Sequence, residues 1–237
     1  MLIYPAIDLY EGKAVRLYRG DYARMTVYSA HPVEVARDFA RQGATHMHVV
    51  DLEGARGGST PNLDTVREIA RSSGLFVECG GGLRSLEAVE AVLSAGAGRA
   101  ILGTAAVEDA QLLETAAREF GSRLAVGVDL RDGLVAVRGW TETSSLTAEE
   151  FMPRIAALGI GTVICTDISR DGAMSGANTG LYRRLSRGFG VDLIASGGVS
   201  SLEDVRALRA LGLHGAIVGR AYYTGDMDLR EAIEVAR

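Results

Sequence analysis

Residues 77–104 read VECGGGLRSLEAVEAVLSAGAGRAILGT, and residues 193–220 read LIASGGVSSLEDVRALRALGLHGAIVGR. The two segments align without a gap at an offset of 116 residues, the separation of Gly81 from Gly197. Each holds an apolar run, a glycine turn, a stretch with helical spacing and a second apolar run. Both therefore predict a strand–helix–strand unit, and their agreement predicts a chain built from two related halves.

The same alternation extends outward over the whole chain. Short apolar runs typical of buried parallel strands lie at 2–9, 46–51, 75–79, 99–103, 124–130, 162–167, 192–196 and 215–219. Stretches with helical spacing lie at 32–42, 62–72, 85–95, 109–120, 147–158, 179–187, 201–211 and 228–236, with Ser85 and Ser201 as expected N-caps. Eight such units without a linker predict one domain over residues 1–237, an α/β fold of the (β/α)8 TIM-barrel class with an internal half-barrel repeat. An open, doubly wound sheet is the alternative.

Charge and composition disfavour several classes of function. The net charge of −5 disfavours a general nucleic-acid surface, so we expect no nucleic-acid partner. The two cysteines are too few for a disulfide scaffold, and the four histidines form no convincing metal-ligand pattern or catalytic group, so no metal is expected. We recognise no signal peptide and no apolar run near the ~18 residues of a membrane span. These features favour a cytoplasmic protein that is not bound to membranes.

Glycine-rich turns follow four of the predicted strands. Glycine lets a backbone approach a ligand closely, and the start of a following helix favours an anion. The phosphate site of barrels commonly lies after strands seven and eight. The sequence therefore predicts two phosphate cradles, one made by Gly81, Gly82, Gly103 and Thr104, the other by Gly197, Gly198, Gly219 and Arg220. Two cradles imply a small substrate with a phosphate at each end; the alternative is that these glycines only make tight turns.

Aspartates stand at the ends of several predicted strands. Asp8 ends the first and Asp129 the fifth, where each would point into the barrel mouth and could act as acid or base; capping of a nearby turn is the alternative. A second matched pair, Asp51 and Asp167, either positions the substrate or anchors loops by hydrogen bonds. Asp171 lies in a glycine- and serine-containing loop that could close over the substrate together with Arg170.

Further polar and aromatic residues complete the candidate binding site. Arginines that follow the first strand could bind a phosphate with two hydrogen bonds each, unless they are solvated surface residues. The only tryptophan could stack on a planar heterocycle, unless it packs as a loop anchor. The candidates beyond the cradles are Arg16, Arg19, Gly20, Trp140, Thr166 and Gly172.

The sequence resembles the phosphoribosylformimino-5-aminoimidazole carboxamide ribotide isomerases of histidine biosynthesis over nearly its whole length. The motifs that carry the resemblance are PAIDLYEGKAVRL, VVDLEGA, CGGGLR, ILGTAAV, GVDL, RGW, TDISRDGAMSGAN, ASGGV and IVGRA. The resemblance implies that Asp8 accepts a proton and Asp129 donates one, with Asp171 as a rival donor. It also implies two phosphate sites at the glycine turns, no cofactor, and a monomer.

Three alternatives remain at this stage. Arg138, before Gly139 and Trp140, resembles the dual-substrate relatives that also isomerise phosphoribosylanthranilate. The cyclase subunit of imidazole glycerol phosphate synthase is disfavoured, since that family usually has cysteine at Ala6 and lysine at Arg16. A non-catalytic phosphosugar-binding barrel is disfavoured by the presence of both Asp8 and Asp129.

Overall fold

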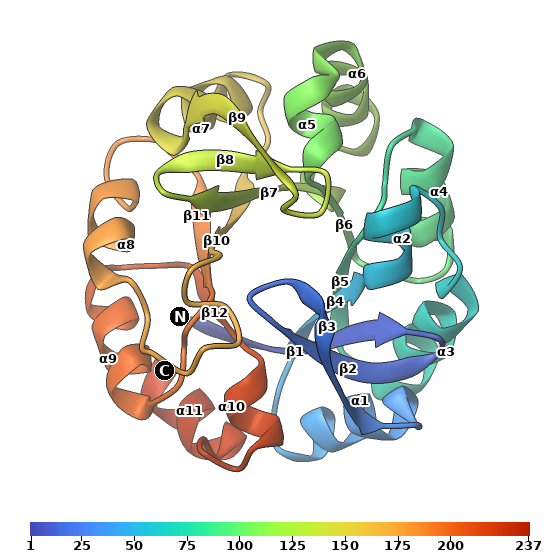
Figure 1. Ribbon diagram of the computed structural model, residues 1–237, viewed down its shortest axis with the longest axis vertical. Helices are drawn as coiled ribbons and strands as arrows, with labels where there is room; N and C mark the ends of the chain where they lie inside the picture. The colour runs from blue at the N-terminus through green and yellow to red at the C-terminus, as the bar shows by residue number, and fades with distance from the viewer.

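The computed structural model describes residues 1–237, and its centre is a closed ring of eight parallel strands (Figure 1). The ring strands are β1 (Leu2–Tyr10), β4 (His46–Asp51), β5 (Phe76–Gly80), β6 (Arg99–Leu102), β7 (Leu124–Arg131), β10 (Thr162–Asp167), β11 (Asp192–Ser196) and β12 (Gly215–Val218). Parallel pairing of β1 with both β12 and β4 closes the ring, with Leu2 beside Gly215 and Ala6 beside His48. The barrel prediction is confirmed, and the open sheet is wrong.

Eight helices surround the ring, one after each barrel strand. They are α1 (Pro32–Arg41), α3 (Leu63–Ser73), α4 (Leu86–Ser94), α6 (Ala110–Phe120), α7 (Ala148–Ala157), α8 (Thr179–Leu185), α9 (Leu202–Ala210) and α11 (Leu229–Ala236). Both expected serine caps are present, because the hydroxyl of Ser85 accepts from the amide of Ala88 and that of Ser201 accepts from the amide of Asp204. No helix is long and apolar enough to cross a membrane.

Apolar side chains fill two layers of the molecule. A cluster of 55 buried residues packs the outer face of the strands against the helices. A second cluster of seven lies inside the barrel and consists of Tyr4, Ala6, Ile101, Ala125, Ile164, Ile194 and Ile217. The interior is thus a packed plug, so a ligand can enter only from an end of the ring.

Several elements at the carboxyl end of the ring are absent from the sequence prediction. They are the hairpin of β2 (Lys13–Tyr18) and β3 (Asp21–Ser29), the hairpin of β8 (Leu134–Val137) and β9 (Glu142–Thr147), and the short helices α2 (Leu52–Gly57), α5 (Thr104–Glu108) and α10 (Arg220–Tyr223). The 3-10 turn η1 (Gly121–Arg123) was not predicted either, but it lies elsewhere, directly before β7. The two hairpins and α2 stand in front of the ring in Figure 1. Strand β3 has no buried residue, so it lacks the apolar run by which the barrel strands were recognised.

The half-barrel repeat is visible in matching contacts. Asn62 donates from its side-chain nitrogen to the carboxylate of Asp51 at 2.8 Å, and Asn178 donates likewise to Asp167 at 2.6 Å. The second pair follows the first at the offset of 116 residues, which separates Asp51 from Asp167 and Asn62 from Asn178. Gly103 and Gly219, at this offset too, share a backbone conformation, with φ −106° and ψ −104° against φ −107° and ψ −103°. The two halves therefore use equivalent residues in equivalent structural positions.

Candidate active site

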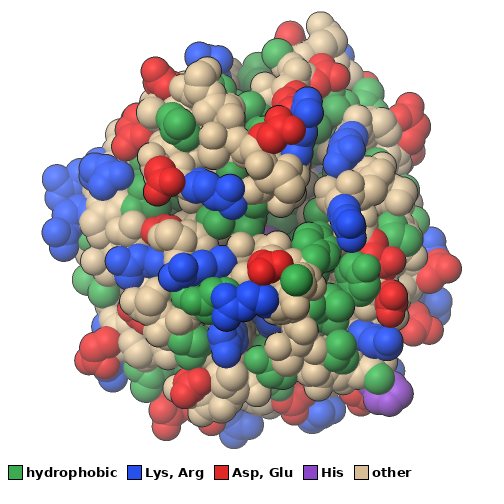
Figure 2. All heavy atoms as spheres, viewed as in Figure 1, with side chains coloured by type: hydrophobic (Ala, Val, Ile, Leu, Met, Phe, Trp, Pro, Cys, Tyr) green, Lys and Arg blue, Asp and Glu red, His purple; other side chains and the backbone are tan.

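A cavity, called here the main cavity, opens at the carboxyl ends of the barrel strands. Its lining includes the predicted residues Asp8, Arg16, Gly20, Gly81, Gly82, Gly103, Thr104, Asp129, Trp140, Thr166 and Asp171. An adjoining, smaller second cavity is lined by Arg16, Asp171, Gly172, Gly197, Gly198, Gly219 and Arg220 among others. Figure 2 shows Lys and Arg side chains around the hollow on this face of the molecule. The fold thus brings together nearly all residues that the sequence singled out.

Asp8 lies near the end of β1 with only 9% of its surface exposed. Its Oδ1 forms an ion pair with Nη1 of Arg16 at 2.8 Å. Arg16 belongs to β2, which runs back antiparallel to β1, so the hairpin folds this arginine over the barrel mouth. Burial works to lower the pKa of Arg16, but the negative charges of Asp8 and Asp171 raise it, so the guanidinium stays charged.

Asp129 lies on β7 and faces the same cavity. The indole Nε1 of Trp140 donates a hydrogen bond to its Oδ2 at 2.7 Å. Burial raises the pKa of Asp129, while hydrogen bonds from Thr166 and Trp140 work to lower it. A carboxyl with a raised pKa holds a proton more readily at neutral pH, which suits a proton donor. Trp140 therefore fixes the orientation of this carboxyl. This role differs from both expectations for Trp140, stacking on a heterocycle and packing as a loop anchor.

Asp171 enters the site from the loop that follows β10, residues 168–178. Burial raises its pKa to about 6, helped by the negative charges of Asp8 and Asp129 and opposed by Arg16. The loop lies against the β2–β3 hairpin, since the amide of Arg19 donates to the carbonyl of Asp171 at 3.1 Å. A Cβ on Gly172 would lie 2.5 Å from the carbonyl oxygen of Leu17, so glycine permits this close approach.

Four of the six cradle glycines, Gly81, Gly82, Gly197 and Gly198, pack against backbone at the end of the neighbouring strand or in the segment that follows it. A Cβ on Gly81 would meet the carbonyl of Asp51, and one on Gly82 that of Gly54. In the second half, a Cβ on Gly197 would lie 2.5 Å from the carbonyl of Asp167, and one on Gly198 equally close to that of Gly176. Tight packing is therefore part of their role, and phosphate binding stays a prediction.

One further observation favours an anion in the second cavity. Arg220 donates from Nη1 to the carbonyl of Gly172 at 2.6 Å, yet its Nε is buried without any hydrogen-bond partner. A buried donor without a partner is costly, and a phosphate oxygen would satisfy it. In the other half, the hydroxyl of Thr104 accepts from the amide of Arg138 at 2.7 Å, which ties it to the β8–β9 turn.

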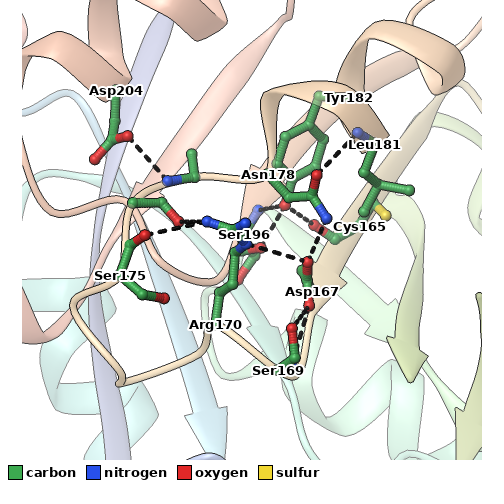
Figure 3. Close-up of polar contacts among 12 residues, drawn as sticks. Cys165, Asp167, Ser169, Arg170, Ser175, Asn178, Leu181, Tyr182, Ser196 and Asp204 are labelled. Carbon is green, nitrogen blue, oxygen red and sulfur yellow. Dashed lines mark hydrogen bonds and ion pairs between the residues drawn. The ribbon is translucent and has the colours of Figure 1, made fainter. Parts of the chain in front are cut away.

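The matched carboxylates Asp51 and Asp167 anchor loops, the second of their two expected roles. Asp51 accepts from the amides of Gly54 and Asn62. Figure 3 shows Asp167 bound by Ser169 and Asn178, and Arg170 turned toward the loop's own carbonyl groups. Arg170 therefore holds the loop in shape, whereas Asp171 beside it reaches the cavity.

Two arginines that the sequence singled out, Arg19 and Arg138, do not reach either cavity. The side chain of Arg19 is exposed and lines neither cavity; its guanidinium lies 5.2 Å from the ring centre of Tyr18. Arg138 is exposed as well and forms ion pairs with Glu108 and Glu142. The residue that suggested a second substrate thus points away from the main cavity.

Among the main-cavity residues that sequence reasoning missed are two with basic side chains, His48 and Arg84. His48 alternates with buried Met47 and Val49 on β4, so strand alternation alone places it on the inner face of the barrel. Arg84 follows Gly82 by two residues and donates to the carbonyl of Ala55 at 3.2 Å. A basic residue so close to a predicted cradle was an available signal. No group of three or more His, Cys, Asp or Glu side chains is arranged to hold a metal ion.

Comparison with known proteins agrees with this arrangement. The sequence profile of a family described as histidine biosynthesis protein matches residues 2–228. A relative from Ruminiclostridium cellulolyticum is 47% identical over 98% of this chain and 99% of its own length. A relative from Roseiflexus castenholzii is 49% identical over 98% of this chain and 98% of its own length. One from Thermoanaerobacter pseudethanolicus is 45% identical over the full length of both chains. All three are named as isomerases of an imidazole-4-carboxamide that carries two phosphoribosyl groups. The chain belongs to the histidine biosynthesis protein family.

Proposed function

We propose that this protein catalyses the isomerisation for which its relatives are named, an Amadori-type conversion of an aminoaldose to an aminoketose in histidine biosynthesis. One observation carries the proposal: three carboxyl groups from Asp8, Asp129 and Asp171 face the main cavity, with the glycine turns of the first half-barrel in its wall and those of the second half-barrel in the adjoining second cavity. The substrate named in the relatives has two phosphoribosyl groups, which matches two glycine-rich anion sites.

The reaction needs only proton transfers, and the carboxyls supply them. Asp129 or Asp171 protonates the ring oxygen of the aminoaldose, and the furanose opens to an imine. Asp8 then removes the proton from the neighbouring carbon, which gives an enolamine. Tautomerisation of the enolamine yields the aminoketose. The raised pKa values of Asp129 and Asp171 support the donor role for one of them.

Binding follows the two ends of the substrate. We assign one phosphate to the second cavity, where Arg220 has its buried, unpartnered Nε, and the other to the turns at Gly81, Gly82 and Gly103. Arg84 lines the main cavity beside the latter turns and adds positive charge there. We expect the protein to act as a monomer in the cytoplasm on this small molecule alone, without nucleic acid, membrane or cofactor.

The test is steady-state turnover of the bisphosphorylated aminoaldose by the purified protein, in EDTA and without added cofactor. Turnover under these conditions supports the isomerase and its acid–base mechanism. Tight binding of the substrate without turnover would instead indicate a non-catalytic phosphosugar-binding barrel. Phosphoribosylanthranilate is assayed in parallel; because Arg138 points away from the cavity, we expect this substrate to react far more slowly.

A further inference from the structure

A buried polar network continues from the floor of the main cavity into the barrel. Oε1 of Glu78 lies 2.7 Å from Nδ1 of His48, which lines the cavity. Oε2 of Glu78 accepts from Nε and Nη2 of Arg99 at 3.1 and 2.6 Å. Arg99 also donates to the hydroxyl groups of Thr162 at 3.0 Å and Tyr4 at 3.3 Å.

Glu78 has no exposed surface, so this carboxylate is costly to bury and needs both of its partners. Burial opposes its ionisation, but hydrogen bonds and charge from His48 and Arg99 outweigh burial and hold the pKa of Glu78 below its usual range. An ionised carboxylate can only accept hydrogen bonds. The proton of a neutral His48 is therefore on Nδ1, and its Nε2 is left as an acceptor.

The other ring nitrogen, Nε2, forms no hydrogen bond with the protein, and the imidazole lines the main cavity. The carboxyls of Asp129 and Asp171 line the same cavity as His48. A lone pair on Nε2 thus faces the space in which the substrate sugar would bind, beside the groups that would exchange protons with it.

We propose that Glu78, held by Arg99, is a positioning residue that fixes the Nδ1–H tautomer of His48 so that Nε2 accepts a hydrogen bond from a ribose hydroxyl of the bound substrate. The assignment to a ribose hydroxyl rests on the function proposed above. The tautomer itself follows from the contacts of Glu78 alone.

A glutamine at position 78 tests this link with almost no change in shape. The amide has one acceptor oxygen and one donor nitrogen. Arg99 requires the oxygen, so the amide nitrogen is left facing Nδ1 of His48 and donates to it. Nδ1 must then be the acceptor, and the proton moves to Nε2. The Glu78→Gln variant should therefore present a donor, not an acceptor, to a donating hydroxyl.

The tautomer is read directly from the ¹⁵N chemical shifts of the His48 ring, at a pH near 9 where imidazole is neutral. We expect Nδ1–H in the unaltered protein and Nε2–H in Glu78→Gln, together with a fall in kcat/KM of about 10- to 100-fold, the cost of an unpaired polar group. Nε2–H in the unaltered protein would overturn the proposal without any variant, which covers the case that Glu78→Gln does not fold.

Tyr4→Phe is the matched control, because it removes a buried hydrogen bond of the same network without touching His48. We expect it to lower stability while the tautomer and kcat/KM stay as they are. A fall in kcat/KM equal to that of Glu78→Gln would show that the network matters only for packing, and the proposal would be wrong. Unchanged kcat/KM in Glu78→Gln with a switched tautomer would equally refute it.

The two proposals fail in different ways. If the unaltered protein does not turn over the aminoaldose, the proposed function fails, while the ¹⁵N measurement still decides whether Glu78 sets the tautomer. If the unaltered protein is active and Glu78→Gln matches it, the isomerase stands and the role of Glu78 is refuted.

Discussion

Replacing Asp171 by asparagine should make the protein more stable at pH 8, although the change removes a candidate catalytic group. Burial raises the pKa of Asp171 to about 6 in the folded protein, against an ordinary value of 3.8. The folded state therefore favours the protonated carboxyl. Its contribution to stability is fully present below pH 3.8 and is lost as the pH rises through about 6. Asparagine resembles the protonated form at every pH.

The size of the effect follows from the two pKa values. A difference of one pH unit corresponds to 1.36 kcal/mol, so full ionisation of Asp171 costs the folded state about 3 kcal/mol. Part of this cost is already present at pH 5, and about 1.4 kcal/mol of it develops between pH 5 and pH 8. The side chain keeps some contact with solvent through the cavity, which makes these values upper limits.

The assay is equilibrium unfolding in urea, followed by circular dichroism, for the unaltered protein and Asp171→Asn at pH 5 and pH 8. All other titrating groups are shared, and the effects of those that do not interact with Asp171 cancel in the difference between the two proteins. The stability advantage of Asp171→Asn should be about 1.4 kcal/mol larger at pH 8. Asp132→Asn, at an exposed turn, is the control and should show no such change. An advantage that stays constant or shrinks with rising pH would refute the reasoning.

Three further predictions concern the same site. Asp8→Asn and Asp129→Asn should each lower kcat by at least about 100-fold in steady-state assays, the lower end of a general acid–base contribution, and near-normal turnover would remove that residue from the mechanism. Trp140→Phe removes a hydrogen bond that lowers the pKa of Asp129, so the ionisation of Asp129 should move to higher pH in the pH profile of kcat/KM; an unmoved profile would contradict this assignment. Gly172→Ala should raise KM more than Gly133→Ala, since both have positive φ but only the former would collide with the β2–β3 hairpin, and equal KM values would argue against loop contact in substrate binding.

The barrel could be predicted because its strands are recognisable in the sequence as short apolar runs. A strand buried on both faces, such as β10 with TVICTD, has no exposed residue and reads as an apolar run. The β2–β3 hairpin gives no such signal, because no residue of β3 is buried. Its half-buried and exposed residues follow one another without a regular alternation. The prediction therefore described Arg16 only as a residue that follows the first strand, whereas it lies in a second strand that folds it back onto Asp8.

A site residue could be predicted when a reactive side chain lies near the end of a recognisable strand. It could not be predicted when its role depends on a contact between neighbouring strands of the closed ring. Asp8 and Asp129 lie near the carboxyl ends of their strands, so the barrel geometry alone brings them to one mouth. Sequence spacing carries no sign that Glu78 of β5 would hold His48 of β4 by one ring nitrogen, because register between neighbouring strands decides it. For the same reason His48 was considered as a metal ligand or catalytic group and set aside.

The repeat separates the scaffold of this site from its chemistry. Asp51 with Asn62 and Asp167 with Asn178 make the same contact in both halves, since each half needs the same anchor for its loop. At the same offset, however, Asp171 corresponds to Ala55, and both residues line the main cavity. An aldose–ketose isomerisation treats the two ends of its substrate differently, so we expect the extra carboxyl to be needed on one side only. A symmetric barrel thus supports an asymmetric reaction by changing residues that face the cavity while keeping those that hold the loops.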